Sequence, residues 1–198
     1  MLNPILVILL APAVTTLALF FLKEDNKRGV RFLAWLGTLI SLIAAIYLFL
    51  SFPNAPVDQS VGDHGYKYVT AVNWVPELGL QFKVGADGVS VALLLLTALT
   101  IFTGVMVSFT IQSRVKEYYI NLLALVTGVF GVFAAQDLFF YYFFYELAVI
   151  PMFLLIGIWG STTKTVDRHY ATMKLVILLS TGAVVVIFAA IYLFLFGI

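Results

Sequence analysis

Six long apolar segments restrict the possible folds of this 198-residue chain more than any other feature of its sequence. A helix needs about 20 apolar residues to cross the hydrocarbon core of a bilayer. In lipid, every backbone N–H and C=O group must be hydrogen-bonded within the protein, which favours helices. The sequence therefore predicts an all-α polytopic membrane protein. About six transmembrane helices are expected, at residues 2–22, 32–52, 88–111, 118–135, 138–160 and 170–198.

The amino-acid composition also indicates a membrane protein. The chain is 63% hydrophobic and 11% charged, whereas a soluble domain carries about 25% charged residues. We expect a single membrane domain over residues 1–198 and no soluble domain. The absence of cysteine excludes disulfides and Cys-ligated iron–sulfur clusters within this chain. The two histidines lie far apart, and no Gly-rich phosphate loop is present, so we expect no metal, cofactor or nucleic acid to bind here.

Lysine and arginine are distributed unequally between the predicted loops. Eight of the eleven lie in the first, third and fifth connections, and only Lys67 and Lys83 lie on the opposite side. The positive-inside rule then places the N-terminus outside, in what we expect to be a bacterial cytoplasmic membrane. No positive charge precedes residues 2–22, which favours a retained helix over a signal peptide. The last segment reaches Ile198 without a polar cap, which is unusual for a complete polytopic protein.

One long outer loop is expected at residues 53–87. Its first half is polar and is predicted to be irregular. Its second half alternates apolar and other residues through Leu78, Leu80, Phe82 and Val84. This period of two predicts a short strand or hairpin.

Glu146 is a lone carboxylate inside the fifth apolar segment. A charged side chain at the centre of a bilayer costs on the order of 3 kcal/mol, and such residues usually mark functional sites. Tyr142 lies one helical turn away, where it can hydrogen-bond the carboxylate. Pro151 removes a backbone donor and frees the carbonyl of Leu147, which favours ordered water. We predict that Glu146 exchanges protons; the alternative is pairing with a neighbouring helix for assembly alone.

Lys174 lies about one turn into the sixth apolar segment. Thr181 falls on the same helical face, so the two residues form a thin polar stripe on an apolar helix. We predict a role in proton transfer for Lys174. The alternative is a lysine that extends its ammonium to the nearby membrane interface. Direct contact with Glu146 is not expected, because the two residues lie at different depths.

The remaining candidate positions have structural interpretations. Asp87 and Asp137 precede apolar segments and are predicted to be N-terminal caps. Trp74 and Trp159 fit the aromatic belts found at membrane interfaces. The segment from Gly128 to Gly131 predicts close packing between helices.

The segment FFYELAVIPMFLLIGIWGS resembles the fifth transmembrane helix of the antiporter-like subunits of complex I (NADH:quinone oxidoreductase). The acid, the proline five residues later and the terminal Trp-Gly are shared. WVPELGLQFKVGADGVSVALLLLT is similar to the segment leading into the third helix of that family, and YATMKLVILLSTG is similar to its sixth helix. The resemblance is greatest to the branch called subunit M or chain 4. It covers nearly the whole chain, which matches the N-terminal portion of such a subunit.

The resemblance implies a proton-translocating membrane-arm subunit built from inverted repeats. The family's fifth-helix acid maps to Glu146 and its sixth-helix lysine to Lys174. No redox chemistry is expected in this chain. NADH, FMN, iron–sulfur clusters and quinone are implied in partner subunits, and sibling antiporter-like subunits and the lipid bilayer are implied as partners. Two alternatives stay open: a subunit of a multisubunit cation/proton antiporter or membrane-bound hydrogenase, and a purely structural membrane subunit.

Overall fold

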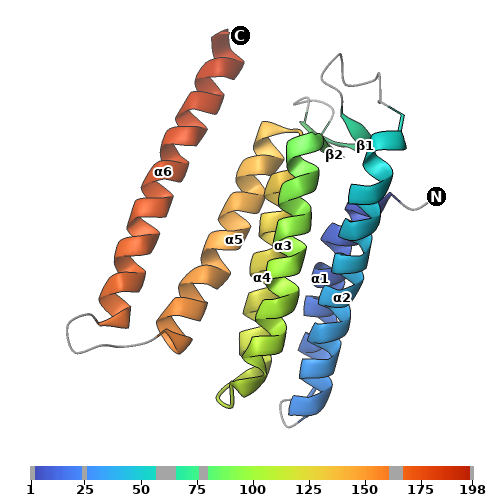
Figure 1. The fold of residues 1–198 in the computed structure, drawn as a ribbon. Coiled ribbons are helices and arrows are strands. Elements are labelled where there is room, and N and C mark those ends of the chain that lie inside the picture. Colours follow the sequence, from blue (N-terminus) through green and yellow to red (C-terminus); the bar gives the residue numbers. More distant parts are fainter. Residues whose placement is uncertain (1–2, 24–25, 57–65, 76–79, 161–166, 197–198) are drawn as a thin grey trace.

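Six helices long and apolar enough to cross a membrane dominate the computed structural model, which describes residues 3–23, 26–56, 66–75, 80–160 and 167–196 (Figure 1). This confirms the predicted all-α membrane fold. The six helices are α1 (Pro4–Phe21), α2 (Lys27–Ser51), α3 (Gly88–Val107), α4 (Val115–Ala134), α5 (Leu138–Trp159) and α6 (Arg168–Phe196). Short 3-10 turns, η1 (Phe52–Asn54) and η4 (Ser108–Thr110), extend α2 and α3.

The helices are arranged as a bundle with two helices added to one side. Helices α1 to α4 pack together, α5 lies against α4, and α6 lies against α5 (Figure 1). Among the described side chains of α6, only Thr172 and Ala183 are buried. Most of the α6 surface is therefore uncovered by the described part of the chain.

A two-stranded antiparallel hairpin closes one end of the bundle, which we call the strand end. It consists of β1 (Lys67–Val75) and β2 (Leu80–Ala86). Strand β2 confirms the alternation noted from the sequence, although Leu78 lies outside the described residues. The expectation of an irregular first half was wrong at Lys67–Thr70, where β1 begins. Register shifts interrupt β1 at two places, so its sequence lacks a clean period of two.

The hairpin also holds the turn between α4 and α5. Val84 bridges to Ala135, and the Gln136 backbone N–H donates to the Lys83 carbonyl at 2.9 Å. The Phe82 ring packs edge-on against Phe140, with centroids 5.1 Å apart. These contacts fix the point at which α5 enters the membrane.

Two aspartates cap helices at the strand end, as predicted. Asp87 Oδ1 accepts a 2.7 Å hydrogen bond from the Ser90 N–H at the start of α3. Asp137 Oδ1 accepts hydrogen bonds from the Phe139 and Phe140 N–H groups at the start of α5. Burial alone would raise the pKa of Asp87. The hydrogen bonds that Asp87 accepts at the start of α3, chiefly from Ser90, outweigh burial and lower the pKa below the ordinary 3.8. The cap is therefore ionised at neutral pH.

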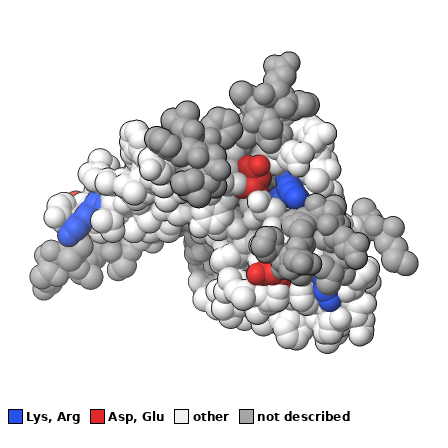
Figure 2. All heavy atoms as spheres, turned by 90° about the horizontal axis from the view of Figure 1, so that it is seen from above, with Lys and Arg blue, Asp and Glu red and all other residues white. Residues whose placement is uncertain are grey.

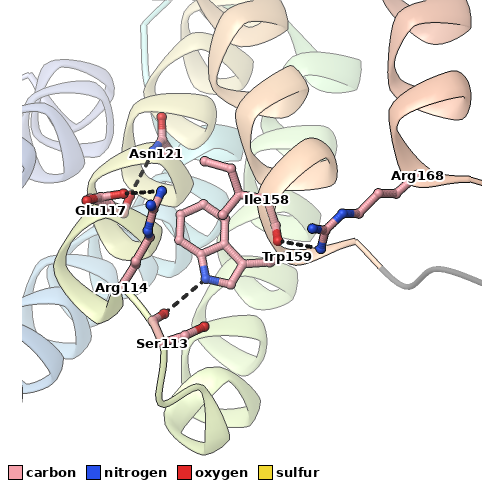
Figure 3. A network of polar contacts seen from close by, with 7 residues as sticks. All are labelled: Ser113, Arg114, Glu117, Asn121, Ile158, Trp159 and Arg168. Carbon is pink, nitrogen blue, oxygen red and sulfur yellow. Dashed lines mark hydrogen bonds and ion pairs between the residues drawn. The ribbon is translucent and has the colours of Figure 1, made fainter.

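The opposite end, which we call the basic end, carries cations that bind helix carbonyls. Lys116 Nζ donates to the Leu22 carbonyl at 2.7 Å, just beyond α1. The Arg31 guanidinium donates to the Ile111 carbonyl at 2.8 Å, and Arg168 donates to Ile158 at the end of α5 (Figure 3). Carbonyls at helix C-termini are unpaired and partly negative, so cations there stabilise them. Among the described residues, the view onto the strand end shows a few charged side chains of both signs (Figure 2).

Two adjacent tyrosines near the basic end differ in the hydrogen bonding of their hydroxyl groups. The Tyr118 hydroxyl lies 2.9 Å from Ser108 Oγ. Tyr119 is 0% exposed, and its hydroxyl finds no hydrogen-bond partner among the described residues. A buried polar group without a partner costs about 1–3 kcal/mol.

We expect Tyr119→Phe to leave the thermal stability of the solubilised protein unchanged or raised, because it removes an unpaired hydroxyl. Tyr118→Phe is the matched control, and it should destabilise by about 1 kcal/mol because it removes a hydrogen bond. Melting temperatures in mild detergent measure both. Destabilisation by Tyr119→Phe larger than that by Tyr118→Phe would contradict this interpretation.

Candidate functional site

Helix α5 presents Glu146 on the side opposite its contact with α4. Phe140, Phe144 and Ala148 are buried and form the packed face of α5. At about 100° per residue, Glu146 lies roughly 180° around the helix from Phe144 and Ala148. The carboxylate is half-buried. It therefore points away from the four-helix bundle, toward the side where α6 lies.

Two glycines on α4 set this orientation. A Cβ added to Gly128 would lie 2.9 Å from the Ala148 Cβ and from the Phe144 carbonyl oxygen. A Cβ on Gly131 would collide with the Phe144 ring. Both glycines are buried, and they allow α5 to approach the α4 backbone closely. This confirms the predicted close packing at Gly128–Gly131.

Tyr142 is the side chain that interacts with Glu146. The two groups are close enough to interact electrostatically, as their one-turn spacing predicts. No ion pair to Glu146 is found within the described part of the chain, where Arg114–Glu117 at 3.7 Å is the salt bridge present (Figure 3). Pro151 is buried inside α5, which continues as a helix on both sides of it. The Leu147 carbonyl, next to Glu146, therefore lacks its usual helical donor.

Lys174 is exposed on α6 and points away from the bundle. It lines an open groove of about 630 Å³ along α6, together with Ile177, Leu178 and Thr181. The predicted sharing of one helical face by Lys174 and Thr181 is thus present. The Thr181 hydroxyl donates to the Ile177 carbonyl of its own helix at 2.7 Å. It remains available as an acceptor on that face.

The structure does not bring Glu146 and Lys174 together. Gly157 of α5 lies opposite Thr172 of α6, 3.7 Å from its methyl group when a Cβ is added. At about 1.5 Å per residue, Glu146 then lies about 13 Å further from the basic end than Lys174. Any communication between the two requires intervening water or other side chains.

A cleft between α5 and α6 was not anticipated from the sequence. It has a volume of about 250 Å³, and its lining includes Tyr145, the residue before Glu146. Three tyrosines of α5 line it opposite small residues of α6. A helical-face analysis of Tyr141, Tyr142 and Tyr145 would have placed them together, but the facing surface of α6 depends on tertiary packing. Among the described residues, no group of three or more metal-ligating side chains is found.

Comparison with known proteins shows which membrane subunits this chain resembles. Residues 135–197 match the family described as NADH:quinone oxidoreductase/Mrp antiporter, TM. NAD(P)H-quinone oxidoreductase chain 4 of Acaryochloris marina is 30% identical over 188 residues, which is 94% of this chain. The chain is therefore similar to the antiporter-like membrane subunits of this family. NADH-quinone oxidoreductase subunit M of Rickettsia prowazekii is 28% identical over 92% of this chain.

Solved structures agree with this assignment of the antiporter-like fold. A chain of respiratory complex I from Thermus thermophilus with bound NADH has a TM-score of 0.71 and 28% identity, and the match covers 91% of this chain. A chain of the archaeal membrane-bound sulfane sulfur reductase has a TM-score of 0.70 at 20% identity, which shows a shared fold. The chain spans about a third of the length of these relatives: 33% of the Acaryochloris protein and 33% of the Thermus chain.

We expect Gly128→Ala to destabilise the protein by about 1–3 kcal/mol, because the new methyl group meets backbone atoms of α5 that cannot rotate away. Gly104→Ala is a matched control on α3, where an added Cβ has no atom within 4 Å. It should be neutral or stabilising, since alanine favours helix more than glycine does. Melting temperatures compare the two variants; equal values would contradict the proposed role of Gly128.

Proposed function

We propose that this chain forms part of a proton-translocating membrane-arm subunit of a respiratory NADH:quinone oxidoreductase. The observation that carries the proposal is Glu146, a carboxyl in the interior of a membrane-spanning helix that faces away from the packed bundle. Such a group costs on the order of 3 kcal/mol in a bilayer unless it has partners or water. The family match and the names of the relatives support the assignment to this type of complex.

Glu146 is the central protonatable group in this proposal. A cation close to the carboxylate favours its ionised form, and withdrawal of that cation favours proton uptake. The uncovered side of α5 and α6 has room for such a cation from outside the described residues. Coupling then consists of moving a positive charge toward and away from Glu146.

Lys174 serves as a relay nearer the basic end. Its exposed ammonium lies on the outer face of α6, at a depth between Arg168 and Glu146. Protons admitted there reach Glu146 through water or further side chains, since about 13 Å along the helix axis separates the two residues. Electron transfer from NADH through FMN and iron–sulfur clusters to quinone belongs to partner subunits.

The unequal charge of the two ends supports an orientation. The basic end faces the cytoplasm, and the N-terminus and the hairpin face outside, because Lys and Arg accumulate in cytoplasmic loops. We place the protein in the inner membrane of a bacterium. Other membrane-arm subunits, including sibling antiporter-like subunits, cover the uncovered face of α6.

Gentle solubilisation followed by identification of co-purifying chains tests the type of complex. We expect this chain to co-purify with NADH-oxidising subunits that hold iron–sulfur clusters. Co-purification with small antiporter subunits or hydrogenase subunits alone would overturn the assignment to NADH:quinone oxidoreductase. It would leave ion exchange through Glu146 as the function.

Glu146→Gln in the assembled complex should reduce proton pumping by roughly tenfold or more, because the amide cannot bind and release a proton. Glu146→Asp retains a carboxyl group and should keep part of the activity. Lys174→Met should reduce pumping less, and Lys174→Arg should preserve most of it. Pumping is measured in membrane vesicles, normalised to the amount of assembled complex. Full pumping per assembled Glu146→Gln complex, with weakened assembly, would favour a purely structural role.

A further inference from the structure

A polar pocket lies at the strand end, outside the site built around Glu146. It has a volume of about 620 Å³, within the range of about 300–1,000 Å³ that is typical of small-molecule sites. The start of α1, the end of α2 and strand β1 form its walls, and α2 ends there at Ser51. The polar side chains that line it are Asn3, Tyr47, Ser51, Asn54, Tyr68 and Thr70.

Hydrogen bonds between the three elements fix the shape of this pocket. The Asn3 amide donates to the Tyr68 carbonyl and, at 2.7 Å, to Thr70 Oγ1, which joins α1 to β1. The Tyr68 hydroxyl donates to Ser51 Oγ at 2.9 Å, which joins β1 to α2. Tyr68 has a φ of 56°, a left-handed conformation that is uncommon for residues other than glycine. The walls are therefore held in place by the protein itself.

Two hydroxyl groups of the pocket have hydrogen atoms to donate. Thr70 Oγ1 accepts from Asn3 and donates to no residue in the described part of the chain. The Tyr47 hydroxyl likewise has no partner among the described residues. No carboxylate is found among the described residues that line the pocket. Its free groups are thus donors, which suit a ligand rich in acceptor oxygens.

Lys67 adds a positive charge beside the pocket. Its Nζ donates to the carbonyls of Phe52 at 2.7 Å and Pro53 at 3.2 Å, next to the lining residue Asn54. An ammonium group has three N–H donors, so one remains for a ligand. No ion pair neutralises Lys67 in the described ranges. This charge favours an anionic acceptor such as a phosphate group.

An uncovered apolar stripe on α2 runs from the pocket toward the middle of the span. Its members recur at spacings of three and four residues, which places them on one helical face. They are 42–69% exposed: Ile40, Ile43, Tyr47 and Leu50. In a bilayer this stripe meets acyl chains, while the pocket at the end of the span lies at the level of the head groups. Tyr47 belongs to both, so the two surfaces are continuous and fit an amphiphile.

We propose that the pocket binds the head group of a phospholipid from the leaflet at the strand end. The phosphodiester oxygens accept hydrogen bonds from the hydroxyls of Tyr47 and Thr70 and from the Lys67 ammonium. One acyl chain lies along the apolar stripe of α2. The bound lipid joins α1, α2 and the hairpin, and this hairpin also holds the turn before α5. The site is independent of any proton transfer at Glu146.

Photo-crosslinking in vesicles tests the lipid site in the assembled complex. The vesicles are made of phosphatidylcholine with a small fraction of phosphatidylglycerol that carries a diazirine on its acyl chain next to the glycerol. The matched probe is a diacylglycerol with the same diazirine and no phosphate. Peptide mass spectrometry then locates the labelled residues, and labelling is normalised to the amount of assembled complex.

We expect phosphatidylglycerol to label the strand-end part of α2 and β1 at least about tenfold more than diacylglycerol, because only the former can accept the hydrogen bonds of the pocket. Equal labelling by the two probes would overturn the inference. Excess inorganic phosphate should leave the labelling unchanged, since it lacks acyl chains. Displacement of the lipid by phosphate would show a site for free anions and would also overturn the inference.

Two variants change the pocket in different ways. Tyr47→Phe removes one donor and should lower labelling at least about threefold. Ala55→Trp adds a bulky ring to the lining and should lower it at least about tenfold. Tyr170→Phe on α6 and Lys83→Met on β2, which change residues outside the pocket, are the controls and should label normally. Unchanged labelling in either pocket variant, or an equal loss in the controls, would overturn the inference.

Discussion

The contact between α4 and α5 determines where Glu146 points. Gly128 and Gly131 present bare backbone to Phe144 and Ala148, and no larger residue fits at either glycine without a shift of α5. Without a hydrophobic driving force between helices in lipid, such close approach is a main source of helix association. Once that face of α5 is fixed, Glu146 must lie on the opposite face. Its proposed role as a proton carrier depends on this orientation of α5.

Most charged side chains of the described spans lie near helix ends. Most cations of the described chain lie at the basic end, and Lys27, Arg31, Lys116 and Arg168 donate hydrogen bonds to carbonyls at or near the ends of helices. These residues therefore complete helix termini, and their unequal distribution is the basis of the proposed orientation. Glu146 is the charged side chain of the described spans that lies furthest from a helix end. Neither explanation applies to it, which leaves chemistry or assembly.

Local signals predicted most of the fold. The apolar segments marked all six spans, and the caps at Asp87 and Asp137 followed from their positions before those segments. Features that depend on distant neighbours were missed. Strand β1 was not recognised because register shifts interrupt its alternation. The hydrogen bond from Lys116 to the Leu22 carbonyl joins residues far apart in sequence. The cleft is lined on one side by α6, whose position depends on tertiary packing. At the candidate site, the sequence analysis singled out Glu146, Tyr142 and Lys174 but not Tyr141 and Tyr145, which share a helical face with Tyr142.

Pro151 has a mechanical consequence for α5. The part of the helix before it is held by the hairpin, the Asp137 cap and the two glycines of α4. The part after it is held at its far end by Trp159, whose indole donates to the Ser113 carbonyl at 3.1 Å (Figure 3). The helical hydrogen bond to the Leu147 carbonyl is missing between these two anchored parts, and helices bend where such a bond is missing. Bending of α5 is therefore expected to concentrate within one turn of Glu146. A small change in the angle of the part after Pro151 then changes the surroundings of the carboxylate while both ends of the helix stay in place.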